Sequence, residues 1–282
     1  MSKRHSTLML LGSLIISGMI IVQMSIYILS MFAGWNVRFN VVAVCHSWLK
    51  VIGLSFLEYV LDVFVIYTLL FLVWKMASHG FHTMRMKKRF ELYKENALTI
   101  EMNESYSSGK NAFLVISHPA AIAITMGLFR PRIVLSTGLI KILTDDELTA
   151  VMYHEMYHKE NRDPLKNFLM SLCSSTLWYI PILKWFNQKY RIVKELLADE
   201  FAIEKQATSV NLGSALLKML KVGKQEKIPF VHASFADTSV NYRIEYLLNP
   251  FMEFQMKLPV KIACLSFLVF SLICMLFVFV LL

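Results

Sequence analysis

Residues 144–164, TDDELTAVMYHEMYHKENRDP, contain two histidines four positions apart and a glutamate directly after the first. On a helix, residues four apart share one face, so His154 and His158 can present two imidazole nitrogens to a single metal ion. Glu155 lies about 100° further round the helix, where it can act as general base toward a water at the metal. The motif alone arises by chance in roughly one such chain in a hundred. It predicts a zinc site if the chain supplies a third ligand.

A catalytic zinc ion needs a third protein ligand and an open fourth position. The downstream stretch 191–206, RIVKELLADEFAIEKQ, places Glu195 and Asp199 on one helical face, with two alanines that would let another helix approach closely. We expect Glu195 to be the third ligand and Asp199 to accept a hydrogen bond from a liganding histidine. The alternative is an ordinary helix with solvated acids. The pairing of this stretch with the first motif favours the metal site.

The first motif lies on a predicted helix with defined ends. Thr144 and Glu147 have the spacing of a capping box, and the Asp163-Pro164 dipeptide predicts the end of the helix, because the residue before proline is pushed out of the α region. Three short β-rich runs come earlier, at residues 112–117, 121–126 and 132–137. We expect a small α+β domain in which the strand nearest the zinc helix, taken to be 121–126, binds an extended substrate.

The remaining sequence has the composition of a membrane protein, since 56% of its 282 residues are hydrophobic. Three apolar runs are long enough to cross a hydrocarbon core of about 30 Å, at residues 8–32, 51–74 and 259–282. Basic residues follow the second run, so the positive-inside rule predicts a multi-pass protein with a cytoplasmic N-terminus and an outer C-terminus. The expected domains are an N-terminal membrane region (1–75), a cytoplasmic zinc metallopeptidase domain (76–258) and a final transmembrane helix (259–282).

The net charge of +9 does not indicate direct nucleic-acid binding, because the basic residues gather beside the apolar runs and form no stripe interleaved with aromatics. Membrane lipids are the expected partner. Within the second run, Glu58 and Asp62 lie one turn apart. Acids inside a membrane are costly, so these two either have a function or face a polar groove or the outer interface.

A hydrophobic segment, residues 165–186, separates the two motifs and would pass as a transmembrane helix in a hydropathy window. A single crossing would place Glu195 roughly 30 Å from His154 and His158, whereas ligands of one zinc ion lie about 2 Å from it. We therefore expect this segment to dip into the membrane and return, to lie along the interface, or to pack inside the domain. Pro181 and the flanking lysines suit the interfacial alternative.

With these residues, the chain resembles the BlaR/MecR-type receptor peptidases of bacteria, integral-membrane zinc metallopeptidases of the gluzincin group. The resemblance extends over about half of the chain. It rests on GLFRPRIVLSTGLI at 127–140, DDELTAVMYHEMYHKENRDPL at 145–165, ELLADEFAI at 195–203 and, more weakly, SVNYRIEYLL at 239–248. It implies an α-helical membrane protein with an embedded α+β, zincin-like domain. With the apolar runs, this gives about three transmembrane helices plus one interfacial or re-entrant segment.

The resemblance also implies one Zn²⁺ per chain, held by His154, His158 and Glu195, with Glu155 as base and acid and Asp199 in support. Peptidases of that family face the cytoplasm of a bacterial cell and cleave a winged-helix transcriptional repressor when an outer sensor domain is acylated by a β-lactam. The sequence ends where sensor-bearing members continue into a penicillin-binding domain, and it has two clear spans before the peptidase region where three are usual. We therefore expect a member without that sensor.

Family receptors also cleave themselves near the end of the peptidase domain, where this chain has VHASFADTS at 231–239. Self-cleavage at Ser234-Phe235 is one hypothesis for this segment. His232 is a candidate stabiliser of the oxyanion in the tetrahedral intermediate. The alternative is that this histidine is an ordinary surface residue.

Three functions are consistent with these features. The leading interpretation is a zinc metalloendopeptidase that cleaves a cytoplasmic regulator, with a winged-helix repressor as the expected protein substrate. HtpX-like quality-control peptidases carry both motifs, but usually with more sequence and a pair of spans between them, whereas 37 positions separate His158 from Glu195 here. A receptor component with an inactive peptidase fold is the third possibility, although every residue that the chemistry requires is present.

Overall fold

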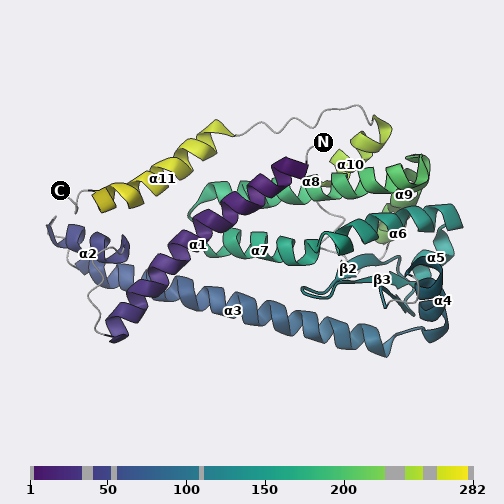
Figure 1. The fold of residues 1–282 in the computed structure, drawn as a ribbon, viewed down its shortest axis with the longest axis horizontal. Coiled ribbons are helices and arrows are strands. Elements are labelled where there is room, and N and C mark those ends of the chain that lie inside the picture. Colours follow the sequence, from purple (N-terminus) through teal and green to yellow (C-terminus); the bar gives the residue numbers. More distant parts are fainter. Residues whose placement is uncertain are drawn as a thin grey trace. The chain divides into compact units, whose positions relative to one another are not determined.

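The computed structural model describes residues 3–33, 41–51, 56–107, 111–225, 239–249 and 259–278. Within them the chain is mostly helical and has one small sheet (Figure 1). In order, the elements are α1 (Lys3–Ala33), α2 (Val41–Val51), α3 (Phe56–Leu92), α4 (Asn96–Ser107), β1 (Phe113–Ile116), β2 (Ala123–Met126), β3 (Arg132–Ser136), α5 (Thr137–Ile142), α6 (Asp145–Glu160), α7 (Asp163–Thr176), α8 (Pro181–Gln206), α9 (Val210–Gln225), α10 (Ser239–Leu248) and α11 (Val260–Val278).

The chain divides into two compact units. The first, here called the sheet unit, comprises Met1–Ser6, Phe81–Phe168 and Lys189–Phe254. The second, here called the apolar unit, comprises Thr7–Gly80, Leu169–Gln188 and Gln255–Leu282. A helical protein with an embedded α+β region is thus confirmed in outline, while the number of spans and the zincin-like fold stay predictions.

The three predicted strands form the sheet, each slightly shorter than its β-rich run. The strand order is β1-β3-β2, with β1 parallel and β2 antiparallel to β3. Gly127 ends β2 with φ +106°, and a Cβ there would stand 2.8 Å from the carbonyl oxygen of Arg130, so this turn requires glycine. Among the described residues β2 pairs on one side only, which leaves it as an edge strand.

Alternate residues of β1 and β3 supply a hydrophobic layer on each face of the sheet, as a strand with period two requires. On one face Phe113, Ile133 and Leu135 pack with residues of α6 and α9, among them Val151 and Met219. On the other face the partners come from the end of α3, and the members are Phe90, Leu114, Ile116, Ala120, Ile122 and Val134. The sheet therefore holds α6 in a fixed position.

Helix α6 begins as predicted, with a complete capping box between Thr144 and Glu147. Its end differs from the prediction. The helix stops at Glu160, and Asp163 and Pro164 instead form the start of α7. Proline is tolerated there because the first turn of a helix leaves its N–H groups unpaired in any case.

Helices α1, α3 and α11 correspond to the three predicted spans. Among the described residues, Lys3–Ala33 and Tyr59–Leu92 are long and apolar enough to cross a membrane, judged by length and composition alone. The predicted start of the second span at residue 51 stays a prediction: α2 ends at Val51 and α3 begins at Phe56, and residues 52–55 lie outside the described part of the chain. The third span, with its apolar helix Val260–Val269, stays a prediction.

A polar cluster joins α1, α2 and α3 inside the apolar unit. The Tyr27 hydroxyl donates to Asp62 Oδ1 at 2.7 Å, and His46 Nε2 lies 3.0 Å from the same oxygen. Asp62 thus lies among polar groups, which agrees with the polar-groove alternative. The side chain of Glu58 lies outside the described part of the chain.

The hydrophobic connector 165–186 forms most of α7 and the start of α8, with the chain reversing direction between Leu177 and Ile180. Asn187 Nδ2 donates to Ser174 Oγ at 3.1 Å across the two helices. Near the turn, buried apolar side chains pack against residues of α1 and α11, including Ile16, Ile20, Leu177, Ile180, Leu183 and Ile262. The connector therefore turns back on itself, as the alternative of dipping in and returning requires.

Candidate metal centre

The three predicted ligands come together, His154 and His158 from α6 and Glu195 from α8. The two Nε2 atoms lie 3.2 Å apart. Glu195 faces both rings, with Oε2 3.5 Å from His154 Nε2 and Oε1 3.6 Å from His158 Nε2. The return of the chain through α7 and α8 therefore brings Glu195 to the side where the motif lies.

The spacing of these atoms suits a tetrahedral ion. Bonds of about 2.0–2.1 Å place neighbouring ligand atoms about 3.3 Å apart in a tetrahedron, and the three observed separations fall between 3.2 and 3.6 Å. Two imidazoles and one carboxylate are also a ligand set that zinc accepts while keeping a further position open. The residues present therefore fit the ion that the sequence predicts.

The candidate ligands open onto a cavity of about 260 Å³. Its apolar lining comes mainly from β2, α6 and α9, and its polar lining comes from β2, α6, α7, α8 and α10. The lining residues are Ala123, Ile124, Thr125, Val151, His154, Glu155, His158, Asp163, Pro164, Asn167, Arg191, Glu195, Leu212, Leu216, Met219 and Arg243. A peptide segment entering this cavity would meet the three candidate ligands.

Glu155 lines the same cavity and is 7% exposed. The hydroxyl of Thr125 in β2 has one hydrogen, which it donates to Glu155 Oε2 at 2.7 Å, and the same hydroxyl oxygen lies 3.0 Å from the Glu155 carbonyl oxygen. This double contact fixes the carboxylate beside the edge strand and occupies one of its two oxygens. Thr125 could not be identified from the sequence, because its contact with Glu155 depends on the packing of β2 against α6.

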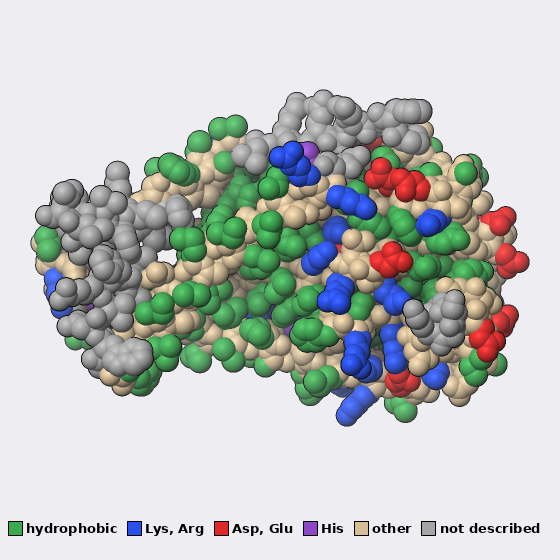
Figure 2. All heavy atoms as spheres, in the orientation of Figure 1, with side chains coloured by type: hydrophobic (Ala, Val, Ile, Leu, Met, Phe, Trp, Pro, Cys, Tyr) green, Lys and Arg blue, Asp and Glu red, His purple; other side chains and the backbone are tan. Residues whose placement is uncertain are grey.

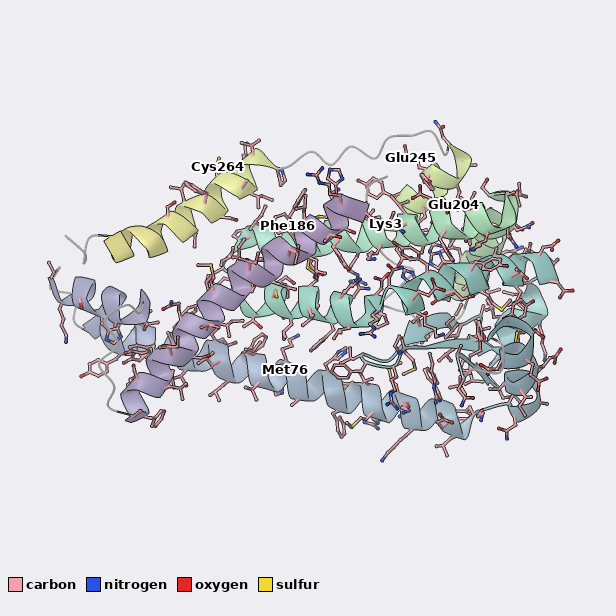
Figure 3. All side chains as sticks on the ribbon, viewed as in Figure 1. Lys3, Met76, Phe186, Glu204, Glu245 and Cys264 are labelled. Atoms are coloured by element: carbon pink, nitrogen blue, oxygen red, sulfur yellow. The ribbon has the colours of Figure 1, made fainter. Side chains whose placement is uncertain are left out.

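Behind His154, Nδ1 lies 2.8 Å from Asp199 Oδ1, as predicted for a carboxylate that supports a ligand. Asp199 is 0% exposed and receives two hydrogen bonds from the Arg243 guanidinium, both of 2.8 Å. Arg243 Nη1 also donates to Glu195 Oε2 at 3.3 Å. The bidentate pair of Asp199 and Arg243 connects α8 with α10. In Figure 3 the label Glu204 identifies α8 and the label Glu245 identifies α10.

Behind His158, an analogous contact had not been predicted. Nδ1 of His158 lies 2.9 Å from Asp163 Oδ2, and Lys194 Nζ lies 2.9 Å from Asp163 Oδ1. In the sequence Asp163 indicated only the end of a helix. Its spacing of five positions from His158 was the signal that could have identified it.

The charges around the centre determine its protonation. Burial would raise the pKa of Glu195, but the contacts with His154, His158 and Arg243 hold it well below its usual range. Burial would likewise raise the pKa of Asp199, and the charge of Arg243 is the largest of the effects that lower it. Both carboxylates are therefore ionised, as binding of a cation requires.

The pKa of the His154 imidazole is raised by its neighbours. Burial and the charge of Arg243 lower the pKa, but the contacts with Asp199 and Glu195 outweigh them and bring it to about 9. A metal ligand must be a neutral imidazole, so binding of an ion here would release a proton.

Two further predictions concern residues outside the described part of the chain. His232, the candidate oxyanion stabiliser, and Ser234-Phe235, the hypothetical self-cleavage site, both lie between α9 and α10 outside the described ranges. The segment SVNYRIEYLL, noted above only as part of the resemblance, forms α10 and contributes Arg243 to the site.

Comparison with known proteins identifies relatives of the chain. The family described as BlaR1 peptidase M56 matches residues 16–247, a range that contains all of the candidate site residues named from the structure. A protein of Bacillus licheniformis named "Regulatory protein BlaR1" is 28% identical over 153 residues, which are 53% of this chain and 25% of that protein. The chain therefore spans about a quarter of the length of this relative.

Proposed function

Since the chain belongs to the BlaR1 peptidase M56 family, we propose that it is a membrane-bound zinc metalloendopeptidase whose active site faces the cytoplasm and which cleaves a regulatory protein. The family match and the relative support a membrane metallopeptidase-type regulatory protein. The convergence of His154, His158 and Glu195 beside Glu155 in one cavity is the observation that carries the proposal.

In this proposal His154, His158 and Glu195 hold the metal. Bound there, Zn²⁺ would supply Lewis-acid polarisation of a peptide carbonyl and activation of water. Arg243 and Asp199 fix the carboxylate and one imidazole before the substrate arrives, because their hydrogen bonds are already made. Such preorganisation avoids rearrangement during the reaction.

Glu155 is the proposed general base and acid. The hydroxyl of Thr125 already donates to Oε2, so Oε1 is the oxygen proposed to take a proton from the attacking water. The same carboxyl group then returns the proton to the amine that leaves when the peptide bond breaks. Thr125 is proposed to keep the carboxylate in one orientation through both transfers.

The edge strand β2 is proposed to bind the substrate. Its residues Ala123, Ile124 and Thr125 line the cavity, and β2 pairs with β3 on one side only among the described residues. An extended segment of substrate can add to such an edge through backbone hydrogen bonds. The apolar wall from α9, with Leu212 and Leu216, would receive its side chains.

The cytoplasmic orientation rests on charge. Six basic residues lie between positions 75 and 94, after the apolar part of α3, namely Lys75, Arg85, Lys87, Lys88, Arg89 and Lys94. The positive-inside rule places such a cluster in the cytoplasm. A substrate there would be a soluble or membrane-proximal regulator, and a winged-helix repressor is the candidate that the family resemblance suggests.

Glu155→Gln tests the proposal, because it removes the base and leaves the three candidate ligands unchanged. New N-termini of cytoplasmic proteins should be compared between cells that express the native chain and cells that express the variant. A repressor-like protein cut only with the native chain would support regulation. Many unrelated membrane-protein fragments would instead favour the HtpX-like quality-control alternative.

The purified proteins complete the test. The Glu155→Gln variant should retain zinc while its cleavage rate falls by about 10²–10⁴. A matched control is Glu160→Gln on the same helix, since Glu160 is exposed. Full activity in Glu155→Gln would disprove this mechanism, and an inactive native chain that binds zinc would indicate the receptor component without catalysis.

A further inference from the structure

A buried ion pair stands behind His158 and takes no direct part in the proposed chemistry. The side chains of Asp163 and Lys194 are 1% and 5% exposed, and their charged atoms lie 2.9 Å apart. Lys194 Nζ also lies 5.1 Å from the ring centroid of Tyr157 and 6.0 Å from that of Tyr190. The lysine is thus enclosed by one carboxylate and two aromatic rings.

Stability alone does not account for this pair. Removing two charges from water costs several kcal/mol for each ion, and well-packed apolar residues are often as stable as a buried pair. The pair instead lies directly behind His158, where the start of α7 meets α8. Asp163 begins α7 and contacts His158, while Lys194 directly precedes Glu195 in α8.

We infer that Asp163 and Lys194 are positioning residues for His158. An ionised carboxylate can only accept hydrogen bonds, so Asp163 is satisfied by a proton on Nδ1 of the imidazole, which leaves Nε2 free to bind a metal. Lys194 Nζ holds the second carboxylate oxygen of Asp163 at 2.9 Å and so keeps that carboxylate in place. This inference rests on the metal site of the proposed function.

The same arrangement occurs at the other histidine. Asp199 lies between His154 and the Arg243 guanidinium as Asp163 lies between His158 and the Lys194 ammonium. Each candidate histidine ligand therefore has a carboxylate at Nδ1 and a buried cation behind that carboxylate. His154 provides an internal reference, because changes at Asp163 should leave it unaffected.

Three variants separate positioning from simple stabilisation. Asp163→Asn keeps the shape of the side chain, but its amide can donate to Nδ1 and so favour a proton on Nε2. Lys194→Met removes the cation and leaves the Asp163 carboxylate buried without it. The double variant Asp163→Asn/Lys194→Met removes both charges. Asp146→Asn/Lys205→Met makes the same changes at exposed positions and is the matched control.

The first measurement needs no metal. In the full chain with ¹⁵N-labelled histidine, kept metal-free at alkaline pH, nitrogen chemical shifts report which ring atom of His158 carries the proton. We expect Nδ1 in the native chain and in the control, and a shift toward Nε2 in Asp163→Asn and in the double variant. Unchanged shifts of His158 in both of these variants would overturn the inference.

The second measurement is zinc affinity, from competition with a chromophoric chelator, together with the thermal unfolding temperature. Asp163→Asn should raise the zinc Kd about 10–100-fold. The double variant should unfold at a higher temperature than Lys194→Met and still bind zinc weakly. If the double variant recovered both the native zinc Kd and the native unfolding temperature, the pair would have only a structural role, and the inference would be overturned. A native chain that binds no zinc would instead refute the proposed function. The nitrogen shifts would then decide whether Asp163 sets the position of the proton on His158.

Discussion

The two units of the molecule differ in the side chains that they bury and in those that they expose. In the sheet unit Ile133 and Leu135 are 0% exposed. In the apolar unit Ser13 and Ser17 are each 1% exposed, while Val63 is 66% exposed. Figure 2 shows the same contrast, with Lys, Arg, Asp and Glu side chains over the sheet unit and hydrophobic side chains along the helices of the apolar unit.

This contrast indicates a different solvent for each unit. Lipid tails are as apolar as leucine, so helices in a membrane lose nothing by exposing large apolar side chains and pack through small ones. A hydroxyl in that environment can bond within its own helix, as Thr68 Oγ1 does by donating to the Phe64 carbonyl oxygen at 2.8 Å. The buried charges of the sheet unit are, by contrast, concentrated around one cavity, which is where a change should have the largest effect.

Removal of the metal should give the largest effect. A strong chelator should reduce peptidase activity to background, because the three candidate ligands then hold no ion, and added Zn²⁺ should restore it. Helix content should be retained, since the apolar helices do not depend on the ion. Cleavage of a reporter substrate and circular dichroism measure the two properties. Activity that persists after measured zinc has been removed would contradict the proposed centre.

Substitution of Arg243 should come next. Arg243→Met leaves Asp199 buried without its bidentate partner, which should lower the free energy of unfolding by about 3–5 kcal/mol. Arg243→Lys keeps the charge and loses the planar fork, so a smaller decrease is expected. Denaturant unfolding measures these differences. Arg130→Met, at an exposed position, is the control, and equal values for the two methionine variants would mean that the buried charges of the sheet unit do not stabilise it.

The sequence predicted the features that depend on near neighbours. The capping box of α6, the three strands and the face shared by His154 and His158 all follow from local spacing. The return of Glu195 was also predictable, because a zinc ion cannot be held from two sides of a membrane. Hydropathy alone would have assigned residues 165–186 to a single membrane crossing. The requirement that Glu195 share a metal with His154 and His158 excluded that assignment.

Features that depend on packing between distant parts of the chain could not be predicted from local spacing. Arg243 lies 44 positions from Asp199, and no spacing rule connects them. Asp163 carried a local signal for the end of a helix, and its ion pair with Lys194, which lies 31 positions further on, becomes visible only when α8 packs beside the start of α7. The orientation in the membrane and the number of spans stay predictions, because they rest on charge and composition.

The difference in solvent can be tested with one substitution in each unit. Val63→Asp in α3 places a charge on a face that is expected to contact lipid, at a cost of about 2.5–3.5 kcal/mol for membrane insertion. Val210 at the start of α9 is similarly exposed, at 71%, but Val210→Asp should change stability by less than about 0.5 kcal/mol. Membrane fractionation and denaturant unfolding compare them. Normal insertion of Val63→Asp would argue against a lipid-facing α3.

The smallest expected effect is a loss of stability at acidic pH. Burial would raise the pKa of Glu147, but hydrogen bonds from Lys218, Ser214 and the Thr144 backbone lower it from 4.5 to about 2. Because the folded state binds this proton less readily than the unfolded state, the stabilisation is full above pH 4.5 and is lost as the pH falls toward 2. Glu147→Gln should lower the free energy of unfolding by about 1–2 kcal/mol at neutral pH. The difference between the variant and the native chain should shrink as the pH falls from 4.5 toward 2.

Measurement of the unfolding free energy at several pH values, for the native chain and for Glu147→Gln, tests this expectation. Asp146→Asn changes an exposed acid on the same helix and should leave the pH dependence as it is. The first turns of α1 and α11 contain no acid, so these helices should persist at a pH that already weakens the sheet unit. If the helices of both units were lost together as the pH fell, the capping box of α6 would not explain the acid sensitivity.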